Sequence, residues 1–515
     1  MSARTVAAVD LGAESGRVVA VSFDGRRLHW RTVDRFPHEP GHLDGALRWD
    51  VDHLFERTAL ALGELAADTD VASVGVDGWG VDYALLHADG TLVDRPTCYR
   101  DPRQQRGLDS AVRTVGRQRL TAASGTRVEA INTVFGLHAD AVEGDRLARA
   151  DLLLMLPDLL HHRLSGTRAT ERTLASTTGA HDAGARRWDT GLLADLGVPE
   201  RILPEVVDAG TETGPLTGDL AGGGLRGARV VVPAAHDTAS AVAATPFAAP
   251  GALFCSSGTW SLIGAEVAPG TGPQRSPALS REAGAGDHHG DRDLLLRNVA
   301  GLWLLQECRR WWAREGLVLD HPALASLAAA EPPLRSLVDP DAEEFVAPGD
   351  LPGRIRAWCA THGEPVPATP GAVARCIVDS LALTYRAVVD EVAAATGTAP
   401  TAIDVTGGGS QHLGLARATA AATGLPVRCG PVEATALGNA GVQLIALGEL
   451  RDLTDLRRVV AASIEGRVLE PEDTAPGGPD ADAWAEAADR LDRAVAAREP
   501  RRVDLTGRLA TTETR

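Results

Sequence analysis

The chain contains the same local pattern twice: a strand, a turn of small and hydroxyl-bearing residues, and a second strand. The first copy begins with the strand Val6–Asp10 and turns through Leu11–Arg17. The second copy spans Leu253–Ile263, with the turn Ser256-Ser-Gly-Thr. Backbone amides that converge in such a turn hold a phosphate without a formal charge. The repeat therefore predicts a duplicated α/β fold in which two phosphate turns face each other.

The sequence contains no lysine, so all 51 of its basic residues are arginine. The P-loop, the protein-kinase strand lysine and Schiff-base catalysis all depend on a lysine ammonium and are excluded. A phosphate must instead be held by backbone amides, hydroxyls, a metal ion or an arginine such as Arg17.

The length predicts more than one domain, because 515 residues exceed what a single hydrophobic core organises. We expect an N-terminal domain over 1–245, a C-terminal domain over 246–465, and a peripheral tail with a helix over 466–515. A cleft between the two domains is the natural place for a small-molecule site.

The net charge of −18 argues against nucleic-acid or anionic-membrane binding, both of which need basic patches. The six cysteines lack CxxC spacing, and no apolar run approaches the roughly 18 residues of a membrane span. We expect a cytoplasmic protein with reduced thiols. The pair His288-His289 lies in a Gly- and Asp-rich stretch and is interpreted as a solvated loop rather than a metal site.

The first part of the chain predicts three antiparallel strands, a helix and a buried strand. This order resembles the ribonuclease-H-like unit shared by actin, heat-shock chaperones and many sugar kinases. The expected strands are 5–10, 17–23, 27–36 and 71–77, with the helix over 52–67. Further helices are predicted over 104–122, 134–143, 151–164, 298–315, 371–396 and 434–448, and a strand over 402–406.

Asp10 ends the first buried strand, where a bare carboxylate is costly unless it is paired or metal-bound. One interpretation is a ligand for Mg²⁺ beside the outer phosphates of a nucleotide. The other is a strand-end carboxylate that satisfies a turn.

Asp237 is the leading candidate for a catalytic base, because phosphorylating a hydroxyl needs a group that accepts its proton. His236 and Thr238 flank it and offer donors to a polyol. A helix N-cap is the structural alternative, and both roles are compatible. Gly80 lies in a glycine-rich strand end, where a substrate can approach the backbone closely. We favour this backbone contact over a chemical role for Asp77 or Asp82.

Taken in order, the motifs closely resemble the FGGY carbohydrate kinases and, within them, the rhamnulokinase branch. The resemblance covers about residues 5–450. Its motifs are AVDLGAESGR, GVDGWGVDYALL, CYRDPR, LMLPDLL, AAHDTASAVAATP, SSGTWSLIGAE, NVAGLWLLQECRRWW, VTGGGSQ and GPVEATALGNAGVQ.

The resemblance implies two actin-like domains and ATP-dependent phosphorylation of L-rhamnulose at its 1-hydroxyl, with Mg²⁺. Asp237 would be the proton acceptor and Asp10 the metal ligand. The ketose would contact Gly80, His236, Asp237, Thr238 and Asn298. ATP would contact Ala13, Glu14, Ser15, Gly16, Arg17, Thr259, Gln306 and Gly408.

Four questions stay open at this level. Another ketose, such as L-fuculose or L-xylulose, would use the same machinery. A non-catalytic, ATP-driven switch would share the fold but would not need Asp237. Glu14 departs from the small hydroxyl residue usual at its position, and its charge beside a triphosphate requires Mg²⁺ or an outward orientation. A monomer or a homodimer fits the sequence equally.

Overall fold

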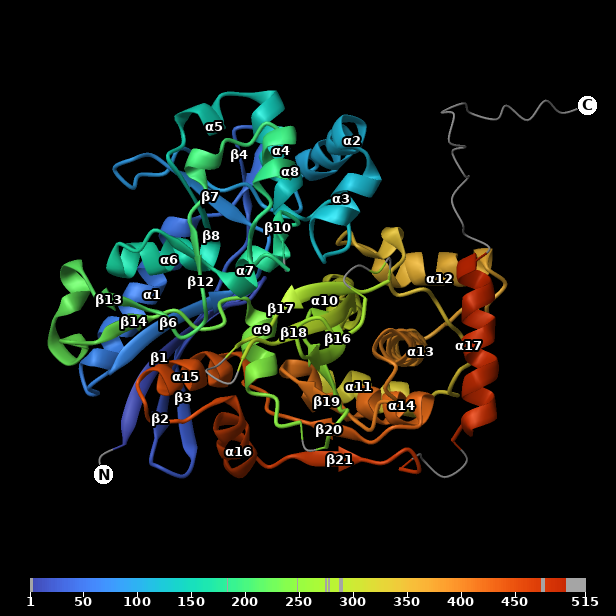
Figure 1. The fold of residues 1–515 in the computed structure, drawn as a ribbon. Helices are drawn as coiled ribbons and strands as arrows, with labels where there is room; N and C mark the ends of the chain where they lie inside the picture. Colours follow the sequence, from blue (N-terminus) through green and yellow to red (C-terminus); the bar gives the residue numbers. More distant parts are fainter. Residues whose placement is uncertain are drawn as a thin grey trace, which may run out of the picture. The chain divides into compact units, whose positions relative to one another are not determined.

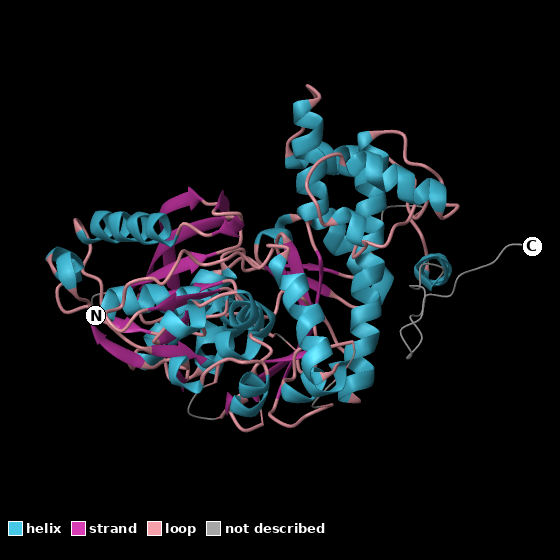
Figure 2. Ribbon diagram, turned by 90° about the horizontal axis from the view of Figure 1, so that it is seen from above, coloured by secondary structure: helices cyan, strands magenta, loops and turns pink. Residues whose placement is uncertain are grey.

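The computed structural model describes residues 3–182, 184–247, 249–273, 276, 278–286, 290–473 and 478–496; the pair His288-His289 lies outside them. The chain forms two compact units. Unit 1 comprises residues 1–298, 388–411 and 427–468, and unit 2 comprises residues 299–387, 412–426 and 469–515. Unit 1 contains nearly all of the β-structure, whereas the described part of unit 2 is mainly helical (Figure 2).

A six-stranded sheet of unit 1 contains the first predicted turn. Its order is β13-β14-β6-β1-β2-β3, with β1 (Arg4–Leu11) antiparallel to β2 (Ser15–Phe23) and parallel to β6 (Ser73–Gly78). β3 (Leu28–Pro37) continues the meander. β1 is buried over seven of its eight residues because both faces of the sheet are covered.

A seven-stranded sheet, also in unit 1, repeats this arrangement. β15 (Leu253–Ser257) is antiparallel to β16 (Trp260–Val267) and parallel to β19 (Ile403–Thr406), as β1 is to β2 and β6. The full order is β17-β18-β16-β15-β19-β20-β21. The predicted duplication and the α/β class are therefore confirmed.

The last helix of the family motifs packs on the first sheet. α15 (Ala434–Ala446) contacts β1, β6 and α9 (Asp237–Ala243), so the two ends of the motif series lie side by side (Figure 1). Gly438 permits the contact with α9, because a Cβ at this position would collide with the backbone carbonyl of Ser240.

The remaining elements of unit 1 complete the layers around the sheets. They are β4 (Gly41–Leu43), β5 (Ala46–Arg48), α1 (Val51–Ala66), β7 (Tyr83–Leu86), α2 (Arg103–Val115), α3 (Arg117–Ala123), α4 (Thr133–Glu143), α5 (Arg146–Arg149), β8 (Leu152–Met155), α6 (Leu156–Ser165), β9 (Ala169–Glu171), α7 (Arg172–Thr177), β10 (His181–Asp182), β11 (Arg187–Trp188), α8 (Thr190–Asp195), β12 (Glu205–Val207), β13 (Glu212–Pro215), β14 (Arg229–Val231), β17 (Ser280–Ala283), β20 (Val427–Cys429) and α16 (Leu453–Ser463). β18 (Asp293–Ala300), α13 (Pro370–Thr396) and β21 (Arg467–Leu469) run across a boundary between the units.

Three predicted helices differ in detail. The segment 151–164 begins as the strand β8 and becomes helical only at Leu156, with Pro157 in the first turn of the helix, where a proline is well tolerated. The segment 298–315 likewise begins as β18, and α10 (Trp303–Arg314) starts after Gly301. The segment 104–122 is two helices separated at Gly116, whose φ is 80°.

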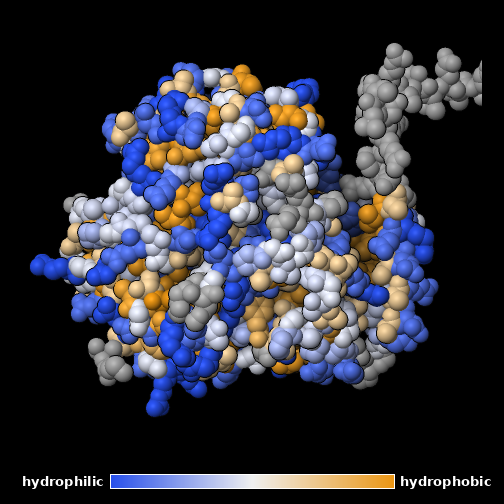
Figure 3. All heavy atoms as spheres, in the orientation of Figure 1, coloured by the Kyte–Doolittle hydropathy of each residue, from blue (hydrophilic) through white to orange (hydrophobic). Residues whose placement is uncertain are grey.

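Unit 2 is built on helices, including part of the tail. Its other helices are α11 (His321–Ala329), α12 (Leu351–Thr361) and α14 (Leu413–Thr423). The tail forms α17 (Ala481–Ala496), which buries Trp484 and packs on α14. The face of the molecule in Figure 3 is mostly hydrophilic, with small separate hydrophobic patches.

Candidate active site

The first phosphate turn is built by the antiparallel pair β1 and β2. The backbone amide of Gly12 donates to the carbonyl of Ser15 at 3.1 Å and closes the turn through Ala13 and Glu14. The register places Asp10 directly opposite Arg17. The loop after β3 supports the turn, because His38 Nε2 lies 2.8 Å from the Gly12 carbonyl oxygen.

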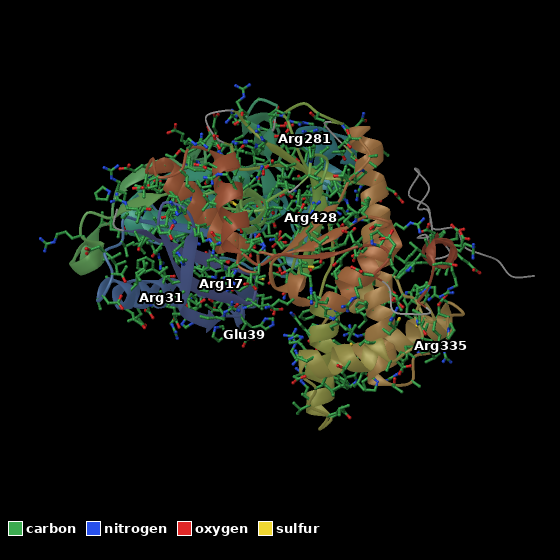
Figure 4. All side chains as sticks on the ribbon, turned by 90° about the horizontal axis from the view of Figure 1, so that it is seen from below. Arg17, Arg31, Glu39, Arg281, Arg335 and Arg428 are labelled. Carbon is green, nitrogen blue, oxygen red and sulfur yellow. The ribbon has the colours of Figure 1, made fainter. Side chains whose placement is uncertain are left out.

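Arg17, a residue of β2 that is labelled in Figure 4, links this turn to the start of α15. Its Nη2 lies 2.5 Å from Asp10 Oδ2, and its Nη1 lies 2.6 Å from Glu433 Oε2. Burial lowers the pKa of Arg17, but the charges of Asp10 and Glu433 outweigh burial and leave it raised. The guanidinium is therefore a fixed positive charge beside the turn.

The second phosphate turn is built in the same way by β15 and β16. The amide of Gly258 donates to the carbonyl of Trp260 at 2.8 Å, and Thr259 lies at the tip. The glycine run after β19 packs against this turn: a Cβ at Gly407 would lie 2.8 Å from the Ser257 carbonyl oxygen. A Cβ at Gly408 would meet nothing within 4 Å, so this residue leaves open space beside the turn.

Three carboxylates gather at neighbouring strand ends. Asp10 and Asp77 are paired residues of the parallel strands β1 and β6. The segment before α9 extends this edge, since His236 forms a bridge with Gly78 and places Asp237 at the first position of the helix. The three carboxylates are close enough to interact electrostatically, because the charges of Asp10 and Asp237 both raise the pKa of Asp77.

The three carboxylates differ in exposure. Asp77 is fully buried, and its Oδ2 accepts a hydrogen bond from Asn439 Nδ2 at 2.6 Å. Burial raises the pKa of Asp77 well above its ordinary value. The side chain of Asp237 is 30% exposed, so it alone combines proximity to the cluster with access from outside. Burial raises the pKa of Asp237 as well, which suits a group that accepts a proton.

The strand end at Gly80 is held in a strained conformation. Val81 has φ of 68°, which is unfavourable for a β-branched residue. Two threonines hold it: Thr177 Oγ1 accepts from the Val81 amide at 3.1 Å, and Thr133 Oγ1 donates to the Val81 carbonyl at 2.6 Å. A Cβ at Gly80 would lie 2.7 Å from Thr177 Oγ1, so only glycine fits. Strain at such a position is typical of a binding site.

A buried aromatic cluster supports this strand end. The carboxylate Oδ2 of Asp82 accepts from Trp49 Nε1 at 2.6 Å and from Trp79 Nε1 at 2.9 Å. His38 stacks on Trp79 with ring centroids 5.3 Å apart. His38 thus connects the phosphate turn to the segment after β6 that contains Gly80. Trp79 is 5% exposed and belongs to the core.

The remaining predicted residues occupy two different units. Asn298 lies on β18 in unit 1, and Gln306 lies on α10 in unit 2. In the described part of the chain, neither Asn298 Oδ1 nor Gln306 Oε1 has a hydrogen-bond partner, although both atoms are buried. A buried amide oxygen of this kind is commonly satisfied by a ligand or water.

Sequence reasoning did not single out three residues of the site. Glu433 and Asn439 lie in the motif GPVEATALGNAGVQ, which the sequence analysis used only as part of the family resemblance. Glu282 lies on β17 and contacts His236 (below). The sequence signal was a charged or amide residue inside an apolar segment, which becomes informative only once its tertiary neighbour is known.

The donor set fits Mg²⁺ better than a metal enclosed by protein ligands. Among the described residues, no group of three or more His, Cys, Asp or Glu side chains could hold a metal ion. Mg²⁺ is usually held by one or two carboxylates together with waters and substrate phosphates. A single strand-end carboxylate at Asp10, beside a phosphate turn, matches that pattern. No described helix is long and apolar enough to cross a membrane.

Comparison with known proteins agrees with this geometry. The model of the N-terminal domain of the FGGY family of carbohydrate kinases matches residues 5–244, and that of its C-terminal domain matches residues 253–447. The chain belongs to the FGGY family. It is an ATP-dependent carbohydrate kinase. The predicted family and enzyme class are thereby confirmed.

Individual relatives of this FGGY kinase match over nearly its whole length. A rhamnulokinase of Bacteroides thetaiotaomicron is 36% identical over 476 residues, covering 91% of this chain and 96% of the relative. A rhamnulokinase of Yersinia pestis is 38% identical over 474 residues, covering 90% and 95%. The crystal structure of Plasmodium falciparum glycerol kinase with ADP has a TM-score of 0.77 at 13% identity, covers 96% of this chain and 98% of its own, and supports the fold.

Proposed function

We propose that this FGGY kinase transfers the γ-phosphoryl group of ATP to the 1-hydroxyl of L-rhamnulose, giving L-rhamnulose 1-phosphate and ADP. The observation that carries the proposal is the position of Asp237 at the start of α9, accessible and next to the carboxylates that end β1 and β6. The identity to rhamnulokinases over about nine-tenths of the chain supports this ketose.

In the proposed reaction, Asp237 accepts the proton of the sugar hydroxyl as its oxygen attacks the γ-phosphorus. Gly80, His236, Thr238 and Asn298 would orient the ketose. The Thr238 hydroxyl donates to Asp237 Oδ1 at 3.1 Å and holds the base in place. His236 and Thr238 are buried and the Asp237 side chain is 30% exposed, which limits access of water to the base and favours transfer to the sugar over hydrolysis.

The two turns would bind the nucleotide. Ala13, Glu14, Ser15, Gly16 and Arg17 would contact ATP phosphates from the first turn. Thr259 would contact them from the second, while Gly408 and Gln306 complete the nucleotide contacts. Asp10 would hold Mg²⁺, which neutralises phosphate charge when bound. Glu433, which contacts Arg17 Nη1, would keep the guanidinium beside the bound phosphates.

The division into domains 1–245 and 246–465, with the tail 466–515, is part of the proposal, and the limits of the two family matches support it. We also propose that the enzyme is cytoplasmic, because all six cysteines are buried free thiols and its co-substrate is ATP. Its proposed oligomeric state is a monomer or a homodimer.

The function is tested by measuring ADP release from the purified protein with Mg·ATP and a panel of ketoses. L-Rhamnulose should give the highest kcat/KM, ahead of L-fuculose and L-xylulose. A preference for another ketose would reassign the substrate. ATP hydrolysis that no sugar stimulates would support a switch protein instead.

The catalytic base is tested by Asp237→Asn, which keeps the shape of the side chain but cannot accept the proton. We expect kcat to fall by ~10²–10⁴-fold, the contribution typical of a general base. Binding of ATP, measured by calorimetry, should change little because Asp237 is assigned to the sugar. Near-normal turnover by the variant would refute the assignment.

A further inference from the structure

A second carboxylate lies on the far side of His236 from Asp237. The imidazole Nδ1 is 3.3 Å from Glu282 Oε2, and its Nε2 is 3.5 Å from Asp237 Oδ1. The three side chains come from different elements: β17 carries Glu282, and the start of α9 carries the other two. The ring thus separates two carboxylates and contacts both.

The inner part of this row is buried. The side chains of Glu282 and His236 are 10% and 9% exposed, whereas that of Asp237 is 30% exposed. Neither His236 Nδ1 nor Glu282 Oε2 has a hydrogen-bond partner among the described residues, so the 3.3 Å approach of the two atoms is a contact between charges. Burial of a carboxylate is costly unless an opposite charge compensates it. A cationic imidazole supplies that charge.

The neighbouring cation is already engaged elsewhere. Arg281 precedes Glu282, and its Nη1 lies 2.5 Å from Asp293 Oδ2. Its other terminal nitrogen donates to the backbone carbonyl of Thr271. Since alternating residues of a strand point to opposite faces, Arg281 is directed away from the face that carries Glu282.

Two arginines lie nearby, but both are paired with carboxylates: Arg17 with Asp10, and Arg172 with Asp208 and Asp291. The other charged groups that act directly on His236 and Asp237 are acidic. Glu171, the last residue of β9, accepts from the amides of Thr173 and Ala235. Burial raises the pKa of Glu171 to about 7, and its ionised form adds negative charge near the ring. Asp10 of β1 and Asp77 of β6 act on Asp237 from the other side. Burial lowers the pKa of His236, but the contact with Glu282, followed by the charge of Asp237, outweighs burial and leaves that pKa raised.

We propose that Glu282 is a positioning residue for phosphoryl transfer, holding His236 as an imidazolium against Asp237 so that the base enters the reaction as a carboxylate. This inference rests on the proposed role of Asp237. Without the imidazolium, burial and the charge of Asp10 would both favour the protonated, inactive carboxyl.

The proton balance of the step is simple. The sugar hydroxyl gives its proton to Asp237, its oxygen bonds to the γ-phosphorus, and the bond from that phosphorus to the bridging oxygen of ADP breaks. His236 keeps its proton throughout. After the products leave, Asp237 releases the proton to solvent, and the row of Glu282, His236 and Asp237 is restored.

The test compares Glu282→Gln with Glu282→Asp. Glutamine keeps the shape of the side chain but removes its charge, so His236 loses its proton more readily and Asp237 loses the nearby positive charge. We expect the acidic limb of the pH profile of kcat/KM for the ketose to move to higher pH by about one unit. At pH values on that limb, kcat/KM of the variant should be about tenfold lower than that of the wild type. Glu282→Asp keeps the charge and should retain most of the wild-type profile.

A role limited to packing predicts a different pattern. The melting temperature and the calorimetric Kd for ATP should stay close to wild type in both variants if the effect is electrostatic. A pH profile unchanged in Glu282→Gln, or an aspartate variant as defective as the glutamine variant, would overturn the proposal. Asp237→Asn in the same assay tests the base separately, so the two assignments can fail independently.

A second measurement does not depend on turnover. Imidazole ¹⁵N spectra of the full-length protein, with the His236 signals assigned by their loss in His236→Asn, report the charge of the ring directly. The ring should stay cationic to higher pH in the wild type than in Glu282→Gln. Identical titrations would refute the proposal even if the substrate were a different ketose.

Discussion

Asp82 illustrates how a single buried carboxyl affects stability. It is 1% exposed, and burial raises its pKa to about 7 despite the two indole N–H groups that donate to it. Its Oδ1 is buried and lacks a partner among the described residues. The folded state therefore holds a proton that the unfolded chain has already released, and this carboxyl opposes folding once it ionises.

The sign of the pH dependence follows from the two pKa values. Between the ordinary value of 3.8 and the folded value of about 7, the folded state binds more protons than the unfolded state. The contribution of Asp82 to the free energy of unfolding therefore falls as pH rises through this window, by at most about 1.4 kcal/mol per pH unit, and is flat above it. Asp82→Asn keeps an acceptor for both indoles and removes the titration.

We therefore expect the free energy of unfolding of Asp82→Asn, relative to wild type, to rise from pH 5 to pH 7 and then level off in urea titrations. Asp89→Asn is the matched control. Its pKa is lowered by hydrogen bonds from Thr91, so it is ionised in both states across this range and the difference from wild type should not vary with pH. Parallel curves for wild type and Asp82→Asn would contradict the prediction.

Single residues were predictable from sequence where the signal was local. Asp10 and Asp237 end apolar segments, and the structure brings them to neighbouring strand ends. Glu282 was not predictable, because its meaning depends on His236, which lies in another element and far away along the chain. The role of Glu433 was not predictable for the same reason, because it depends on the ion pair with the distant residue Arg17.

At the level of elements, α15 links the last motif of the chain to the first sheet through buried amides. Gln443 Nε2 donates to the Ala7 carbonyl at 3.0 Å, and its Oε1 accepts from Ser73 Oγ at 2.7 Å. Asn439 donates to Asp77 and to the carbonyl of Gly75. Because each amide satisfies backbone or side-chain groups inside the sheet, the helix has a single register.

Two helical glycines give opposite predictions for the same substitution. Gly438 in α15 faces the backbone of α9, and a Cβ there collides with the Ser240 carbonyl. Gly63 in α1 is exposed and has nothing within 4 Å of a built Cβ. Gly438→Ala should lower the free energy of unfolding by roughly 1–3 kcal/mol through overpacking, whereas Gly63→Ala should raise it by about 0.5–1 kcal/mol through helix propensity.

Urea unfolding of the two variants measures both effects, and a kinase assay shows whether the base next to α15 is disturbed. Gly438→Ala should also reduce kcat, since α9 begins with Asp237. Gly63→Ala should leave kcat unchanged. Equal stability of the two variants would show that α15 and α9 can separate without cost.

Element types were predicted well where the hydrophobic period was long and failed at short apolar runs. Within the segment 151–164, residues 152–157 form a short apolar run, which suits a buried strand as well as a helix. Residues 152–155 become a strand because they pair with β7. Residues 298–300 likewise continue β18, which adds to the second sheet. Sheet partners of this kind are set by tertiary structure, not by the local sequence.

At the level of the whole molecule, the proposed sugar contacts and the C-terminal helix belong to different compact units. Gly80, His236, Asp237, Thr238 and Asn298 all lie in unit 1, whereas α17 lies in unit 2. α17 is held by Trp484, which is 2% exposed, and by Arg490, whose Nε lies 2.9 Å from Glu364 Oε1. The tail that the sequence placed at the periphery thus contributes a buried tryptophan to the helical unit.

Trp484→Ala should separate stability from sugar recognition. Removing a buried tryptophan costs about 3–5 kcal/mol, which should appear in urea unfolding as a loss of stability of the helical unit. Val495→Ala in the same helix is the control, because that side chain is 39% exposed and its loss should change stability by no more than about 0.5 kcal/mol. At a temperature where both variants stay folded, KM for the ketose should equal that of wild type. A large rise in this KM with Trp484→Ala would mean that the sugar site depends on the packing of α17, and the assignment of sugar recognition to unit 1 residues alone would be wrong.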